Sequence, residues 1–222
     1  MQSFEAQVEE YVRRRCREHL KQQEKLLNRP LAFDYRLEHT RTAVGFAGEL
    51  AGELGIDPAL ARIATWLHDI AKCWDPALTE EENRQRGNNH GPAGGKEAAD
   101  FLRSIGVPGG LASRVQQAVS VHAGLIKDYF LKEPLSALVW DADKLSKISG
   151  AGMLHYLGYI LASGDEIIDL AAYFAAADWI DLHRGIRDSL NTEAARNRAD
   201  LEMAAAVRLR RQLLAVVRGD EP

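Results

Sequence analysis

Almost every segment of the chain carries apolar residues at helical spacing, and no segment alternates apolar and polar residues as a half-buried strand does. In residues 35–54, for example, the apolar positions from Ala43 to Leu54 cluster on one side at about 100° per residue. Asp57-Pro58 then supplies an N-cap and a first-turn proline for the next helix. The sequence therefore predicts an all-α fold.

Length and composition indicate one globular domain. The 222 residues are 46% hydrophobic and 27% charged, which is enough for one substantial core. No repeat, low-complexity segment or clear linker divides the chain. We therefore expect a single domain over residues 1–222, with an N-terminal helix in 1–30, a central bundle in 35–150 and a C-terminal helical extension in 151–222.

Several local features are also expected. Residues 74–89 are polar and turn-rich, which predicts a surface loop. A helix over residues 110–123 would carry His122 on its buried side. Two or three further helices are expected between residues 154 and 217, and Asn191 could cap the last of them.

Charge and cysteine content limit the partners and the compartment. The net charge is −4 and the pI is about 6.0, so the general positive footprint of a nucleic-acid-binding protein is missing. The first thirty residues have no apolar signal region, and the most apolar late stretch is too short to span a bilayer. Cys16 and Cys73 fit free thiols in a reducing compartment. We expect a soluble, cytoplasmic protein that binds neither nucleic acid nor membranes.

The dipeptide His68-Asp69 lies at the end of an otherwise apolar helix, and Lys72 follows three residues later. Placing an imidazole and a carboxylate against a core is costly unless something compensates for the lost solvation. A divalent metal provides that compensation, because it binds a deprotonated imidazole and a carboxylate. This pair is the strongest single indication of a metal site.

The other candidates each have an ordinary explanation. His39 and His122 would be hydrogen-bonded core histidines, and His90 would be a residue at the start of a helix. Asp143 would be a solvated helix charge. Each of these ordinary explanations would have to be correct for its own residue, whereas a single metal site would explain all of these residues at once. Helical bundles build metal sites from facing helices in this way.

The order of these residues along the chain resembles that in a known protein family. Together with three local phrases, it resembles the HD-domain metal-dependent phosphohydrolases over residues 35–150. The phrases are Glu38-His39-Thr40-Arg41, Leu67-His68-Asp69-Ile70-Ala71-Lys72 and Ala142-Asp143-Lys144-Leu145. The resemblance implies a single helical HD-domain bundle with additional C-terminal helices.

His90-Gly91-Pro92 and the later His122 are similar to the six-ligand, two-metal subtype, and the layout resembles bacterial symmetrical dinucleoside tetraphosphate hydrolases. The tail after residue 150 departs from that subgroup, and residues 191–196 resemble the ending of another HD hydrolase subgroup. A mixed imidazole and carboxylate shell suits Fe, Mn, Zn, Co or Ni. The resemblance implies a first metal on His39, His68, Asp69 and Asp143, and a second on Asp69, His90 and His122.

On the expected helix over residues 134–148, periodicity does not choose between Asp141 and Asp143, because they lie on opposite flanks of the apolar stripe. The resemblance chooses Asp143, since the family's aspartate directly precedes a basic residue, here Lys144. Asp141 would then bond to a metal ligand or remain a surface charge.

Positive side chains near these motifs are candidates for binding a substrate phosphate. Lys72 lies one helical turn after His68 if the helix continues that far, and Lys144 and Arg41 belong to the other two phrases. Each also fits a surface charge. The loop 74–89 and the segment 124–133 could cover a pocket.

We expect a phosphohydrolase that acts on a nucleotide or another small phosphate ester through a metal-activated hydroxide bridging two ions, with Asp69 and Lys72 as catalytic residues. Two alternatives remain at this stage. Some HD-fold proteins with the same ligands are di-iron oxygenases of small polyols or phosphonates. The third possibility is a non-catalytic nucleotide-binding module.

Overall fold

The structure, a computed structural model, describes residues 3–163, 169–176 and 178–219. These residues contain helices and no strand, so the predicted all-α fold is confirmed. No described helix is long and apolar enough to cross a membrane. In chain order the elements are α1 (Phe4–Leu27), α2 (Tyr35–Glu53), α3 (Pro58–Leu67), the 3-10 turn η1 (Ile70–Lys72), α4 (Glu80–Asn88), α5 (His90–Ser104), α6 (Gly109–Ser120), α7 (Pro134–Ile148), α8 (Gly150–Ser163), α9 (Leu170–Ala175), α10 (Asp178–Asp188) and α11 (Glu193–Arg218).

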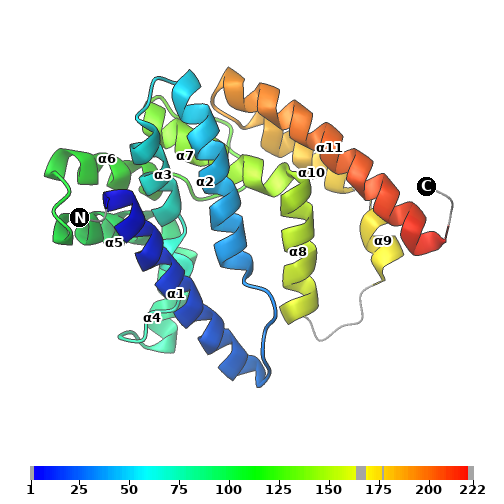
Figure 1. Cartoon of the computed structure of the whole chain (residues 1–222), viewed down its shortest axis with the longest axis horizontal. Coiled ribbons are helices and arrows are strands. Elements are labelled where there is room, and N and C mark those ends of the chain that lie inside the picture. Colours follow the sequence, from blue (N-terminus) through cyan, green and yellow to red (C-terminus); the bar gives the residue numbers. More distant parts are fainter. Residues whose placement is uncertain (1–2, 164–168, 177, 220–222) are drawn as a thin grey trace.

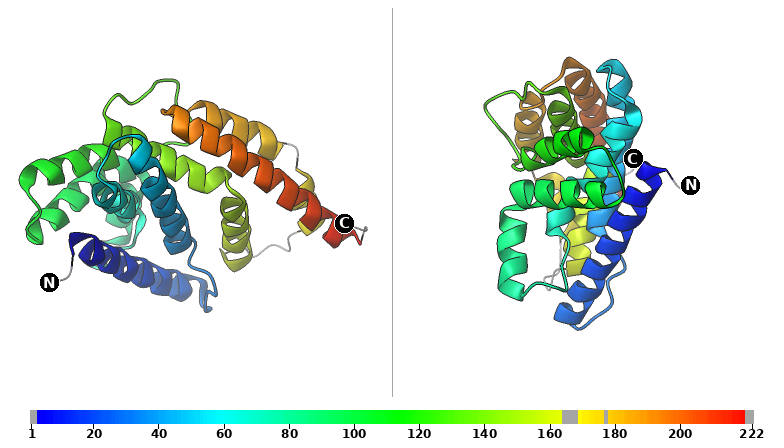
Figure 2. Two further views of the ribbon diagram at one scale, coloured as in Figure 1. Left: turned by 45° about the horizontal axis from the view of Figure 1, so that its top comes forward. Right: turned by 90° about the vertical axis from the view of Figure 1, so that its left-hand side faces the viewer.

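Helix α7 lies at the centre of the bundle. Nearly all of its residues are buried, and it packs against α2, α3, α6, α8, α10 and α11. Figures 1 and 2 place α1 and α3–α6 on one side of α2, and α8–α11 on the other. Helix α1 begins on one side of the molecule and helix α11 ends on the other (Figure 1). The centre of the fold is therefore the contact between α2 and α7.

Several helix boundaries follow from capping residues that the sequence shows. Asp57 accepts a hydrogen bond from the backbone of Ala59, and Pro58 occupies the first turn of α3. Gly106 follows the end of α5 with a φ of 86°, a left-handed conformation that suits glycine. These features match the sequence predictions.

Other local expectations were wrong. The segment expected as a loop contains α4, which begins with a capping box between Thr79 and Glu82. Helix α6 ends at Ser120, so His122 follows the helix instead of lying on it. Thr192, and not Asn191, caps α11 by accepting a bond from the backbone of Ala195. Among the described residues, four helices, α8 to α11, follow α7, where two or three were expected.

The two cysteines meet across the bundle. Cys16 of α1 and Cys73, directly after η1, are both buried free thiols, and their sulfur atoms lie 3.9 Å apart. This contact joins the N-terminal helix to the turn that follows His68-Asp69, so α1 supports the backbone of that motif.

Candidate metal centre

Histidine and aspartate side chains from separate parts of the fold converge between α2, α7 and the ends of α3, α4 and α6. Five of the six are buried, with at most 5% of their surface exposed, and His90 is partly buried. We call this group the His/Asp cluster. It consists of His39 from α2, His68 and Asp69 after α3, His90 at the start of α5, His122 after α6, and Asp143 from α7.

Asp69 lies at the middle of the cluster and faces a pair of histidines with each carboxylate oxygen. Its Oδ2 is 3.9 Å from Nε2 of His39 and 3.8 Å from Nε2 of His68. Its Oδ1 is 3.2 Å from Nε2 of His122 and 4.0 Å from Nε2 of His90. In each of these two groups, the possible metal-ligand atoms lie within 4.8 Å of one another.

Asp143 completes the first of these groups. Its Oδ1 is 3.1 Å from Nε2 of His39 and 3.6 Å from Nε2 of His68. The two Nε2 atoms are themselves 3.3 Å apart. Asp143 therefore adds a fourth possible donor beside His39, His68 and Asp69.

The same kind of local hydrogen bond orients three of the histidines. His68, His90 and His122 each follow the end of a helix by one or two residues, and each bonds through Nδ1 to the backbone carbonyl three residues earlier. The Nδ1–O distances are 2.7, 3.1 and 2.6 Å, respectively. The last carbonyls of a helix have no donor within the helix. Because a carbonyl only accepts, Nδ1 carries the proton and Nε2 keeps a free lone pair toward the cluster.

His39 is oriented by a side chain instead. The Ser146 hydroxyl donates to the backbone carbonyl of Asp143 at 2.7 Å, so its oxygen accepts from Nδ1 of His39 at 3.0 Å. This leaves Nε2 of His39 without a proton as well. Ser146 lies one turn after Asp143, and the same turn of α7 therefore fixes two members of the cluster.

Burial disfavours the charged form of three of the imidazoles. It lowers the pKa of His39 to about 3 and that of His90 to about 4, and it also lowers the pKa of His122. A metal ion binds only the neutral imidazole. These histidines are thus in the metal-binding form throughout the neutral range.

The two aspartates are ionised although they are buried. Burial alone would raise the pKa of Asp69, but the charge of Lys72 holds it well below its usual range. Nζ of Lys72 lies 2.9 and 3.0 Å from the two carboxylate oxygens of Asp69. For Asp143, ion pairs with Lys144 and Lys147 likewise hold the pKa well below its usual range, against the effect of burial.

The expected phosphate-binding residues lie in different surroundings. Lys72 contacts Asp69, although α3 ends at Leu67 and does not continue one turn beyond His68 as the sequence suggested. Lys144 is buried, bonds to Asp143 and to the backbone carbonyl of His122, and its pKa is lowered by burial to about 8. Arg41 is half exposed and pairs with Glu38 at 3.1 Å.

Two cations at the cluster were missed by sequence reasoning. Nη1 of Arg36 lies 3.8 Å from Oδ2 of Asp69, and Lys147 pairs with Asp143. Helical spacing carried this signal, because Arg36 is three residues before His39 and Lys147 is four residues after Asp143. Arg41 is two residues after His39 and so falls on another side of α2.

Asp141 does not belong to the cluster. It is fully buried, so it is not a surface charge, and it bonds to Asn191 and Thr192 at the start of α11. No described contact joins it to a member of the His/Asp cluster, so the expectation that it would bond to a metal ligand was also wrong. Its carboxylate instead fixes α11 to α7.

Comparisons with known proteins agree with this architecture. Bacillus subtilis YpgQ has a TM-score of 0.62 at 19% identity, over 98% of this chain and 99% of that chain. YpgQ in complex with ADP gives 0.56 at 21% identity, over 82% and 88%. An HD-superfamily hydrolase from Bacillus thuringiensis gives 0.57 at 19% identity, over 94% and 100%. No curated protein matches the chain.

At these identities the solved structures show a shared fold. The family model of the HD domain matches residues 36–183. That match begins just before His39 and continues past the expected core of 35–150 into α10. Because it spans more than half of the chain, the protein belongs to the HD-domain family.

Proposed function

We propose that this protein is a metal-dependent phosphohydrolase that holds two divalent transition-metal ions in the His/Asp cluster. Membership of the HD-domain family supports such an activity in general. One observation carries the proposal furthest: Asp69 faces a pair of histidine Nε2 atoms with each of its oxygens. A single carboxylate in this position suits two neighbouring ions.

The donor set fits transition metals. Four neutral imidazole nitrogens and two carboxylates suit Fe, Mn, Zn, Co or Ni better than Ca or Mg. The Nδ1 bonds that orient the imidazoles are those that metal-binding histidines usually make. This six-ligand arrangement is the one that we associate with symmetrical dinucleoside tetraphosphate hydrolases. The first ion would be held by His39, His68, Asp69 and Asp143, and the second by Asp69, His90 and His122.

The ions, when bound, would neutralise charge on a phosphoryl oxygen and lower the pKa of water. The chain's own contribution is to position the phosphate and to stabilise its charge. Lys72, Arg36 and Lys147 have side chains that are 29%, 20% and 25% exposed, so they can reach a substrate from the edge of the cluster. Lys144 is buried, and we assign it to holding Asp143 in place.

A nucleotide is the substrate class that we favour. Bacillus subtilis YpgQ, which shares the fold, has been crystallised in complex with ADP. The cations around the cluster also suit an anionic phosphate group. Neither observation favours the oxygenase alternative, which the experiment below distinguishes.

The test is phosphate release from a panel of nucleotides and small phosphate esters by Mn- or Fe-loaded protein under nitrogen. We expect hydrolysis that needs no dioxygen and that falls at least about a hundredfold in Asp69→Asn. Asp100→Asn is the matched control, because Asp100 is exposed on α5 and pairs with Lys96. Dioxygen consumption without phosphate release, or full activity in Asp69→Asn, would overturn the proposal.

A further inference from the structure

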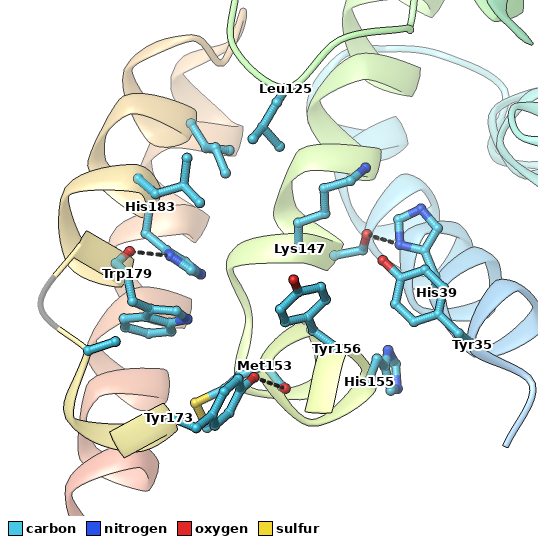
Figure 3. A pocket seen from close by; sticks show the side chains of 15 residues that line it. Tyr35, His39, Leu125, Lys147, Met153, His155, Tyr156, Tyr173, Trp179 and His183 are labelled. Atoms are coloured by element: carbon cyan, nitrogen blue, oxygen red, sulfur yellow. Dashed lines mark hydrogen bonds between the residues drawn. The ribbon is translucent and has the colours of Figure 1, made fainter. Parts of the chain in front are cut away.

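A cavity of about 820 Å³ opens beside the His/Asp cluster (Figure 3). Its size lies within the roughly 300–1,000 Å³ that is common for small-molecule sites. Helices α2 and α7 form the wall nearest the cluster, and α8, α9 and α10 form the rest, together with Leu125 from the segment between α6 and α7. Most of the cavity is therefore built by chain that follows the metal-binding motifs.

One end of the cavity reaches the cluster itself. His39 and Lys147 both line the cavity, and Lys147 is also paired with Asp143. Tyr35 stacks on His39, with ring centroids 5.8 Å apart and planes at 7°. Its pKa is raised to about 12 by burial and by the carboxylates of Asp143 and Asp69. This end offers positive charge and possible metal ligands to an anionic group.

The other end is aromatic. Tyr156 of α8 lies between the His39 side and the Trp179 side of the cavity in Figure 3. Tyr173 borders the same space, and the rings of Trp179 and His183 are 3.8 Å apart. Tyr156 is 53% exposed, so part of its side chain is open to a ligand that enters the cavity. These rings offer faces on which a planar ligand can stack.

Two polar atoms of the cavity lining have no hydrogen-bond partner of their own. Nδ1 of His155 and Nε2 of His183 are buried, and neither atom has a hydrogen-bond partner within the described part of the chain. A polyol or a bare sugar has no flat π face to place against these rings. A heteroaromatic ring would instead use the faces for stacking and its polar edge for a side chain such as His155.

We propose that this cavity holds the base of a nucleotide whose phosphate lies at the His/Asp cluster, with Tyr156 and Trp179 as the residues that determine specificity. The proposal rests on the phosphohydrolase function above and adds, for the nucleotide favoured there, the residues that contact its base. It also gives α8, α9 and α10 a role, because these helices bring the aromatic wall to a metal centre formed by earlier parts of the chain.

Binding of three probes to the full-length protein tests the proposal: adenosine, ADP and ribose 5-phosphate, measured by titration calorimetry. Tyr156→Ala should weaken adenosine and ADP binding about tenfold, the scale expected for one stacked base. Tyr156→Phe keeps the ring and should stay within about threefold of the wild type. Leu154→Ala is the matched control, since Leu154 is 44% exposed on the same helix and does not line the cavity. Ribose 5-phosphate binding should be equal in all four proteins.

The outcomes separate the two proposals. Adenosine that fails to bind, or ADP that binds equally to the wild type and Tyr156→Ala, would overturn the base site even if phosphate esters are hydrolysed. Tyr156-dependent adenosine binding without phosphate release from any ester would support the base site and overturn the hydrolase. Loss of binding in Tyr156→Phe as large as in Tyr156→Ala would overturn the stacking role.

Discussion

Asp141 and Asp143 are two residues apart on α7, and their carboxylates make contacts on opposite flanks of that helix. Asp143 faces His39 at 3.1 Å, while Asp141 accepts four hydrogen bonds of 2.7 to 3.0 Å from Asn191 and Thr192. Burial raises the pKa of Asp141, whereas the neighbouring lysines hold that of Asp143 well below its usual range. One helix therefore carries a carboxylate for the cluster and another for the fold.

Neutralising each carboxylate should give different defects. Each carboxylate oxygen of Asp141 accepts from two donors, so Asp141→Asn replaces one shared acceptor with an amide NH2 that would face two of the four donors. We expect a loss of about 2–4 kcal/mol in the free energy of unfolding, with metal bound per folded chain unchanged. Asp143→Asn should keep the fold but lower metal content and affinity. Urea unfolding in EDTA and elemental analysis of the purified variants measure both effects. A metal-depleted Asp141→Asn of wild-type stability would contradict this division.

The fold could be predicted from the sequence wherever it depends on residues that are close together in the chain. Helical periodicity and the caps at Asp57-Pro58 and Gly106 depend on neighbours within one or two turns. The role of Asp141 was not accessible, because its partner Asn191 lies fifty residues away in the chain. Helix α4 was missed because it has no buried residues and therefore no apolar stripe.

The possible metal ligands of the candidate site could be predicted from the sequence. The basic residues around these ligands could be predicted only in part. Periodicity and family resemblance named the six residues that the structure brings together. Whether they bind metal remains a prediction. Arg41 was selected because it lies next to the motif, although Arg36 shares the helix face of His39. The helix ends that orient His68 and His122 could not be placed to the residue from the sequence.

Lys72 gives a second prediction, because its ammonium neutralises Asp69 in the absence of metal. Lys72→Ala should lower catalytic efficiency about ten- to a hundredfold, as expected for one lost charge-assisted hydrogen bond to substrate phosphate. Metal affinity should stay the same or increase, because a competing positive charge is removed. Steady-state kinetics and metal titration on the same preparation separate the two effects. Lys96→Ala, at an exposed site on α5, is the control. A variant that loses metal would show that Lys72 supports the ligands instead.

Arg86 ties α4 to the turn that follows Asp69. Its guanidinium donates to the backbone carbonyls of Cys73 at 2.6 Å and Ile70 at 3.2 Å, and it pairs with Glu97 of α5. The Arg86 side chain is 11% exposed, so little water competes for these bonds. The segment expected to be a surface loop thus holds the backbone of the central motif.

A third prediction follows from these bonds. Arg86→Ala should lower the free energy of unfolding by about 1.5–3 kcal/mol, because it removes the partner of one Glu97 oxygen and of the Cys73 carbonyl, while Glu97 keeps its bonds to Tyr11 and Arg15. Metal affinity should fall with it, since η1 fixes the position of Asp69. Arg84→Ala on the same helix should change stability by less than about 0.5 kcal/mol, because its pair with Glu81 is exposed. Equal stability of the two variants would show that α4 does not support the motif.

His19 provides a pH-dependent contact away from the cluster. The backbone N–H of Trp74 donates to Nδ1 of His19 at 3.2 Å, so that nitrogen must be unprotonated. Burial, with a smaller contribution from the charge of Arg36, lowers the pKa of His19 from 6.5 to about 3. The unfolded chain binds this proton below about pH 6.5 and the folded chain does not until about pH 3. Stability therefore falls as the pH falls through this window.

His19→Gln should remove part of the dependence of the unfolding free energy on pH. A glutamine oxygen can accept the same hydrogen bond from Trp74, and it does not titrate. Between pH 7 and pH 5 the wild type should lose about 1–2 kcal/mol more unfolding free energy than the variant. Urea unfolding at both pH values, in EDTA so that metal binding does not contribute, measures the difference. The cluster histidines are present in both proteins, so their own acid sensitivity cancels in the comparison. Equal losses in the two proteins would mean that His19 is already protonated, or already released from Trp74, at pH 5.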